Sequence, residues 1–169
     1  MTRNGFDLLE NLGRRNILLS AAQEKYFAEV LQKNHSVKCD GRTGEPDIYL
    51  EDLNKELECK LTSPHKSGTI AFQSDYETLE KKGKLDYLYV VADKLFKNFA
   101  VIHYRDLTIE DFRGLSSGAR GKTQMKKYAA HDRAEVLLGR FESINDRELS
   151  KLSKKAAAAT SSSQKQKIQ

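Results

Sequence analysis

The chain has 169 residues, and its 29 Lys and Arg exceed its 24 Asp and Glu to give a formal net charge of +5. With 31% charged and 38% hydrophobic residues, this length predicts one folded, polar domain and excludes a chain that is disordered throughout. No apolar stretch is long enough to cross a bilayer and the N-terminus carries no secretory signal, so we expect a cytoplasmic protein without a membrane partner. The modest positive charge fits a nucleic-acid partner, and it also fits an ordinary basic protein.

The two cysteines, Cys39 and Cys59, argue against a structural zinc site. They form no C-x-x-C pair and have no zinc-ligand spacing with the four histidines. Cys59 falls in an alternating segment, where a free thiol packs as a small hydrophobe. Reduced thiols agree with a cytoplasmic protein.

Two helices are predicted before the first strand. Residues 1–15 hold a short apolar group that ends at Gly13, which indicates a small helix docked on the main body. A longer helix is predicted over residues 20–34, because Ser20 is a suitable N-cap and Gln23 completes a capping box.

One acidic residue falls on the apolar side of the longer helix. Phe27, Ala28 and Leu31 form an apolar stripe, and at roughly 100° per residue Glu24 lies within the same arc. An acid on a buried helix face needs a reason, because an unpaired buried charge is costly. Glu24 therefore either reaches water at the edge of the stripe or belongs to a site.

The chain is organised around residues 45–63, which predict a strand hairpin. A short strand over residues 36–40 precedes it, and residues 46–50 form its first strand, opened by Pro46. Residues 51–55 supply a polar turn. Residues 56–61 then alternate strictly, with Leu57, Cys59 and Leu61 on one face and Glu56, Glu58 and Lys60 on the other.

The polar face of this hairpin brings carboxylates and an ammonium together. Glu58 and Lys60 share a face, and Asp47 on the partner strand is expected opposite one of them, about 4.5–5.5 Å away. Carboxylates that close need a cation between them, and Mg²⁺ (or Mn²⁺) takes oxygen ligands and keeps several waters. A lysine beside the ion could orient or deprotonate one of those waters. The set suits phosphodiester hydrolysis, and a hairpin that is merely salt-bridged is the alternative.

The next elements complete an α/β pattern. Residues 70–82 predict a helix with Gly83 at its C-terminal end. Residues 86–92 and 99–104 predict strands buried on both sides. The order of helix, three strands, helix and two strands favours a mixed central sheet flanked by helices.

From residue 108 the chain becomes basic. We expect a short helix at residues 108–112, a glycine and serine loop at 113–121, a helix at 122–138, and a disordered tail over residues 151–169. Lysine and arginine there suit phosphates, and arginine also pairs with guanine edges; a solvated helix face is the alternative. The candidate DNA contacts are Arg42, Lys66, Arg113, Arg120, Lys122, Lys126 and Lys127.

Pro46-Asp47 followed by Glu58-Cys59-Lys60 resembles the signature of the PD-(D/E)XK nuclease superfamily, and the resemblance covers about residues 20–92. It implies a restriction-endonuclease-like αβββαβ core within one nuclease domain over residues 1–150. It further implies that Asp47, Glu58 and the backbone carbonyl of Cys59 hold the metal and that Lys60 is catalytic. Glu24 and Gln73 would support that site, Gln73 from the helix at 70–82.

The resemblance implies a function as well. We expect a Mg²⁺-dependent, restriction-like endonuclease that cleaves double-stranded DNA at specific sequences. A homodimer is expected, because two antiparallel strands need two active sites. The alternatives are a Holliday-junction resolvase or another structure-specific or repair nuclease, and a non-catalytic basic DNA-binding module.

Overall fold

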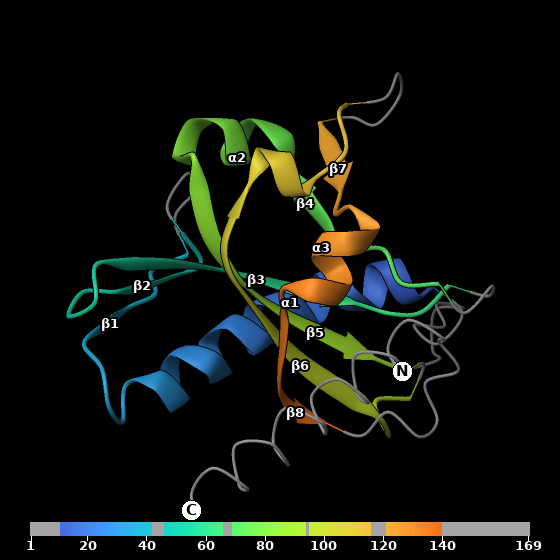
Figure 1. Ribbon diagram of the computed structural model, residues 1–169. Helices are drawn as coiled ribbons and strands as arrows, with labels where there is room; N and C mark the ends of the chain where they lie inside the picture. The colour runs from blue at the N-terminus through green and yellow to red at the C-terminus, as the bar shows by residue number, and fades with distance from the viewer. Residues whose placement is uncertain (1–10, 42–45, 66–68, 94, 116–120, 140–169) are drawn as a thin grey trace, which may run out of the picture.

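The computed structural model describes residues 11–41, 46–65, 69–93, 95–115 and 121–139 (Figure 1). They form an α/β fold around a mixed six-stranded sheet with the strand order β1-β2-β3-β5-β6-β8. These strands are β1 (Val37–Lys38), β2 (Ile48–Leu50), β3 (Lys55–Thr62), β5 (Lys84–Ala92), β6 (Phe99–Thr108) and β8 (Ala134–Gly139). Within the described residues no helix is long and apolar enough to span a membrane.

The remaining elements cover the two faces of this sheet. They are α1 (Leu12–Leu31), α2 (Tyr76–Lys82), α3 (Lys127–Asp132), the 3-10 turn η1 (Ile109–Asp111), and a ribbon of β4 (Gln73–Asp75) and β7 (Lys122–Gln124). Helix α1 lies on one face, whereas α3 and the β4–β7 ribbon lie on the other (Figure 1). The candidate hairpin is β2–β3, near one edge of the sheet.

The sheet is antiparallel except between β3 and β5. A parallel pair needs a crossover, and the chain through β4 and α2 supplies it. In this parallel register Glu58 is opposite Tyr87, and Lys60 is opposite Tyr89. Glu58 and Lys60 therefore share the sheet face of these two tyrosines, opposite the α1 face.

The core has one apolar cluster on each face of the sheet. Ala28 of α1 packs with Leu57 and Cys59 of β3, while Phe72 belongs to the cluster on the other face. The predicted burial of β5 on both sides is confirmed, because every residue after Lys84 in this strand is buried. Alternate side chains of β5 enter opposite clusters, which explains its continuous apolar sequence.

The N-terminal prediction was wrong in its division into two helices. Helix α1 is continuous, and its N-cap is Asn11, whose side chain accepts the Arg14 N–H at 3.1 Å. Ser20 lies inside the helix, with its hydroxyl donating to the Ile17 carbonyl at 2.9 Å. Gly13 is tolerated because it falls in the first turn, and the predicted residues 1–10 lie outside the described part of the chain.

Arg15 explains why the early part of α1 is held on the sheet. Its side chain is only 3% exposed, donates to the Ser63 hydroxyl at 2.6 Å and to the Asp93 carbonyl at 3.0 Å, and stacks on the Phe96 ring. These partners lie at the ends of β3 and β5, far along the sequence. Local capping signals therefore could not have revealed this anchor.

The segment predicted as a helix over residues 70–82 divides into β4 and α2. Asp75 caps α2, accepting the Thr78 N–H at 3.1 Å, and Gly83 ends the helix with φ of 76° as predicted. The preceding residues are extended because they pair with β7, where Ser74 is opposite Thr123. That partner lies nearly fifty residues away, outside the reach of helical periodicity.

The helix predicted over residues 122–138 was also wrong. The chain forms β7, then α3, then β8, because β7 pairs with β4 and β8 pairs with β6. Arg133 forms an ion pair with Asp111, so it is structural. The short helical turn expected near residues 108–112 is present as η1, and the predicted tail at 151–169 lies outside the described residues.

Candidate active site

The β2–β3 hairpin brings Asp47, Glu58 and Lys60 together. Ile48 pairs with Leu57, so Asp47, one residue before β2, lies beside Glu58. Lys60 Nζ is 2.7 Å from Glu58 Oε2 and 3.8 Å from Asp47 Oδ2. All three side chains are partly buried, which places the charges in a setting less polar than water.

A backbone contact fixes the position of Asp47. Its Oδ2 accepts the Cys59 N–H at 2.7 Å. Because β2 begins at Ile48, the main chain of β3 beyond Leu57 has no β2 partner, and the Asp47 carboxylate takes the vacant hydrogen-bonding position. The carboxylate is therefore anchored to the strand that carries Glu58 and Lys60.

Helix α1 contributes a third carboxylate, Glu24. Burial raises the pKa of Glu24, and repulsion from Asp47 raises it further, against a smaller lowering by Lys60. Glu24 is therefore electrostatically coupled to the hairpin charges, and its supporting role in the site stays a prediction.

The charges around Lys60 determine its protonation state. Burial would lower the pKa of Lys60, but the carboxylates of Glu58 and Asp47 outweigh burial and raise that pKa. Lys60 is consequently an ammonium at neutral pH, able to donate hydrogen bonds and to supply positive charge. This arrangement favours an orienting role over a general-base role.

The donor set suits a hard divalent cation. Within the described residues no three His, Cys, Asp or Glu side chains are grouped to hold a metal. A metal there would be held by Asp47 and Glu58, with the Cys59 carbonyl and water completing its ligands, as Mg²⁺ permits. The charge balance also fits, because the two carboxylates of Asp47 and Glu58 exceed the one ammonium of Lys60.

Sequence reasoning missed two residues beside these carboxylates. Burial and the charges of Glu24 and Asp47 raise the pKa of Cys39, so its thiol stays protonated close to the site. The Gln23 side chain reaches the Lys60 carbonyl at 3.5 Å, and its Oε1 is buried without a hydrogen-bond partner among the described residues. The sequence did offer a signal for Gln23, because this residue is adjacent to Glu24. We instead interpreted Gln23 as part of a capping box with Ser20.

The structure does not bring the Gln73 side chain into this cluster. Gln73 lies on β4 instead of the predicted helix, and it is exposed. Its carbonyl accepts the Tyr89 hydroxyl at 2.7 Å, but its side chain forms no hydrogen bond among the described residues. The supporting role of Gln73 in the active site therefore stays a prediction, and no contact of its side chain with the cluster supports it.

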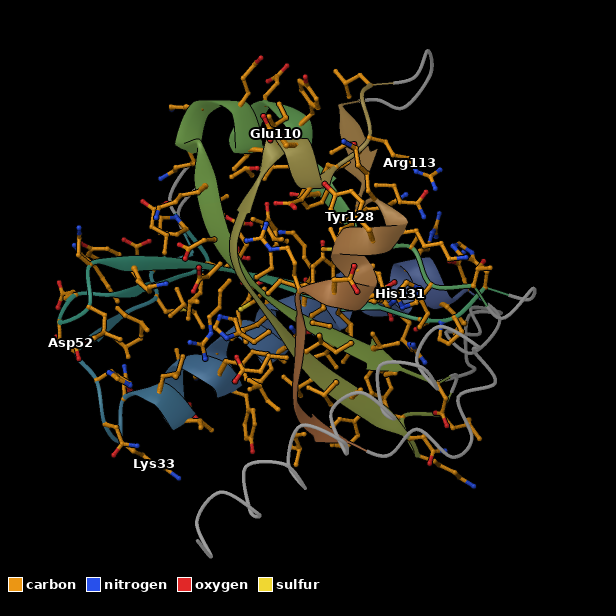
Figure 2. The ribbon with its side chains drawn as sticks, viewed as in Figure 1. Lys33, Asp52, Glu110, Arg113, Tyr128 and His131 are labelled. Atoms are coloured by element: carbon orange, nitrogen blue, oxygen red, sulfur yellow. The ribbon has the colours of Figure 1, made fainter. Side chains whose placement is uncertain are left out.

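The predicted DNA contacts lie on several elements rather than on one helix. Lys122 is on β7, 3.3 Å from Asp75, whereas Lys126 donates to the Glu110 carbonyl at 2.7 Å. Lys127 begins α3 and is exposed, and Arg113 is exposed beside β7 (Figure 2). Arg42, Lys66 and Arg120 lie outside the described residues.

The chain has no match among the proteins with which it was compared. No protein-family model, no curated protein and no solved structure matches it significantly.

Proposed function

We propose that the chain is a Mg²⁺-dependent endodeoxyribonuclease that cleaves double-stranded DNA at specific sequences. The observation that carries the proposal is the arrangement of Asp47, Glu58 and Lys60 at one hairpin, with Glu24 of α1 electrostatically coupled to them. Two carboxylates beside an ammonium are suited to binding a metal ion and hydrolysing a phosphodiester.

The order of elements supports a restriction-endonuclease-like core. Helix α1, strands β1 to β3, helix α2 and strand β5 follow the order αβββαβ, and β4 is an addition before α2. Asp47 lies one residue before β2, and Glu58 and Lys60 lie on β3, an order that supports the proposal.

The residues divide the chemistry between them. Asp47 and Glu58 would hold Mg²⁺ with the Cys59 carbonyl, and the bound ion would lower the pKa of a water and neutralise charge on the phosphate. Lys60 orients water or a phosphate oxygen through its ammonium, and Glu24 holds water by accepting hydrogen bonds. Hydrolysis breaks one P–O bond and adds the elements of water across it.

Double-stranded DNA and a homodimer belong to the same proposal. The basic residues Arg113, Lys126 and Lys127 provide positive charge for the backbone. A dimer would supply one hairpin site for each strand of the duplex. A Holliday-junction resolvase would use the same residues, so a four-way junction is included as a substrate below.

One observation favours a non-catalytic DNA-binding module as the second candidate. Lys60 already lies within 2.7 Å of Glu58 and 3.8 Å of Asp47, so the hairpin charges are partly satisfied without a metal. Such a module would bind DNA equally well with Mg²⁺ and with EDTA.

The test is incubation of the purified chain with supercoiled plasmid, in Mg²⁺ and in EDTA. We expect discrete cleavage products in Mg²⁺ only, and a loss of at least a hundredfold in rate for Lys60→Ala and Asp47→Asn, in line with the removal of a transition-state contact. Asp47→Asn is preferred to alanine because the amide can still accept the Cys59 N–H. Lys84→Ala, a change at an exposed lysine paired with Asp106, serves as the matched control and should retain activity.

The outcomes separate the candidates. Cleavage by Lys60→Ala at the wild-type rate would show that the site is wrongly assigned. Cleavage of a four-way junction but not of linear duplex would favour the resolvase. DNA binding without cleavage of plasmid or junction would favour the binding module.

A further inference from the structure

Three short backbone segments lie side by side over the tyrosines of the sheet. Strand β4 pairs with β7, and on the other edge of β7 Met125 bridges to Phe112 in antiparallel fashion. The inward side chains Phe72, Met125 and Phe112 are only 2–3% exposed. Phe72 packs edge-on against Tyr89 at 5.1 Å between ring centroids.

A neighbouring residue on each segment points the other way, as extended chain requires: Gln73 after Phe72, Arg113 after Phe112 and Gln124 before Met125. Gln73 is opposite Gln124 in the β4–β7 register, and the Arg113 N–H donates to the Gln124 carbonyl at 2.9 Å. Gln73, Gln124 and Arg113 thus form one outward row across three adjacent segments, here called the recognition row. Figure 2 shows Arg113 at the surface near β7.

The backbone beneath this row is firmly held. The Tyr89 hydroxyl donates to the Gln73 carbonyl at 2.7 Å, and Ser74 and Tyr87 share a buried hydrogen bond of 2.7 Å. The Thr123 hydroxyl donates to the Arg113 carbonyl. The backbone of the recognition row is therefore rigid before any ligand binds. Less conformational entropy is then lost on binding.

The side chains of the recognition row have no internal role among the described residues. None of the three forms a side-chain hydrogen bond or an ion pair with another described residue, and the two residues that flank Gln124, Thr123 and Met125, are buried. Three polar side chains with about thirteen unused hydrogen-bonding positions, four on each glutamine and five on the arginine, are well suited to binding an external ligand from a rigid surface.

The row and the candidate active site share one face of the sheet. Tyr89, which contacts the Gln73 carbonyl, is the register partner of Lys60, and Tyr87, which contacts Ser74, is the register partner of Glu58. Burial raises the pKa of Tyr87 to about 12, so its hydroxyl serves as a neutral link.

We propose that the recognition row reads base edges in the major groove of duplex DNA, with Gln73 and Gln124 selecting adenine and Arg113 selecting guanine. Glutamine pairs with two atoms of adenine and arginine with two atoms of guanine, and the major groove admits paired β-strands. Lys126 and Lys127 follow directly on the chain and suit the flanking phosphates. The proposal rests on the proposed function only in taking DNA as the partner.

The test measures sequence preference by binding, so that it does not depend on cleavage. The full-length Lys60→Ala chain is mixed with a random duplex library in Mg²⁺, and bound DNA is recovered and sequenced. We expect an enriched motif that contains A·T positions beside a G·C position. Gln73→Ala and Gln124→Ala should each lower discrimination at their own A·T position by roughly tenfold to a hundredfold.

Two further variants sharpen the result. Arg113→Lys keeps the positive charge but loses the two-atom pairing, so it should lose the G·C preference while keeping most of its affinity. Gln32→Ala, an exposed glutamine at the end of α1 on the other face, is the matched control and should leave the motif unchanged.

Each outcome decides the proposal. A motif that survives all three recognition-row changes, binding without any motif, or no binding at all would overturn it. If the bound DNA shows the expected motif but the wild-type chain never cleaves plasmid, the recognition row is supported and the nuclease assignment is wrong. Cleavage at sites insensitive to the row would retain the nuclease and reject the row.

Discussion

At the scale of single residues, the hairpin charges are coupled rather than independent. Lys60 is held as an ammonium by Glu58 and Asp47, whereas burial, and after it the same carboxylates, raise the pKa of Glu24. A bound cation would neutralise the carboxylates that now share one lysine. It would therefore lower the pKa of Lys60 and also the pKa of Glu24. Metal binding and proton uptake at Glu24 are therefore expected to oppose each other.

Glu24→Gln tests this coupling through the pH dependence of stability. The folded-state pKa of Glu24 lies above its ordinary value of 4.5, so its contribution to stability is fully present below pH 4.5 and is lost as the pH rises through the raised pKa. In EDTA, we expect Glu24→Gln to be more stable than the wild type at pH 7, with a difference that shrinks towards zero at pH 4. Urea unfolding at the two pH values measures it, and a variant less stable at pH 7 would contradict the expected burial of this charge.

At the scale of elements, α1 contains two competing start signals, and the structure uses the earlier one. Asn11 caps the helix through its side chain, whereas Ser20 bonds back to Ile17 within it. Starting at Asn11 adds about two and a half turns, which place Arg15 against Ser63 and Asp93. The burial of Arg15 therefore favours the long helix over the short one.

The two signals can be separated by a pair of alanine substitutions. Asn11→Ala removes the N-cap and should lower the free energy of unfolding by about 1 kcal/mol. Ser20→Ala should change it by less than about 0.5 kcal/mol, because alanine is a better helix former at an interior position. Chemical denaturation of both variants measures the difference. The reverse ranking would place the start of the helix at Ser20.

At the scale of the whole molecule, the carboxylates come from α1, from the start of β2 and from β3. Asp47 and Glu58, the two carboxylates proposed to hold the metal, take up this arrangement only in the folded chain, so the metal would bind the native state and not the unfolded one. Binding of that kind stabilises the fold by mass action.

Mg²⁺ should therefore raise the thermal stability of the protein. At a concentration a hundredfold above its Kd we expect about 2.7 kcal/mol, or a rise in Tm of about 5–10 °C for a chain of this size. Asp47→Asn should abolish most of this rise, whereas Asp106→Asn, at a carboxylate 50% exposed on β6, should keep it. Calorimetry with Mg²⁺ and with EDTA measures the shift, and an unchanged wild-type Tm would argue against the metal site.

The sequence by itself determined the elements whose signals are local. The alternation of Leu57 and Cys59 with Glu58 and Lys60 predicted both β3 and the polar face of the hairpin, and the apolar run in β5 predicted a strand buried on two sides. Short-range periodicity suffices here because a strand exposes one face at every second residue. The grouping of Asp47 with Glu58 followed from the short turn between them.

Only the tertiary structure decided the elements that depend on distant partners. Residues of β4 and β7 are strands because they pair with each other across the chain, and Arg15 extends α1 because it contacts the ends of β3 and β5. No local pattern distinguishes such segments from helices, since the stabilising contacts are made by residues far away in sequence. The same reason applies to the recognition row, whose three residues become neighbours only when three separate segments are laid side by side.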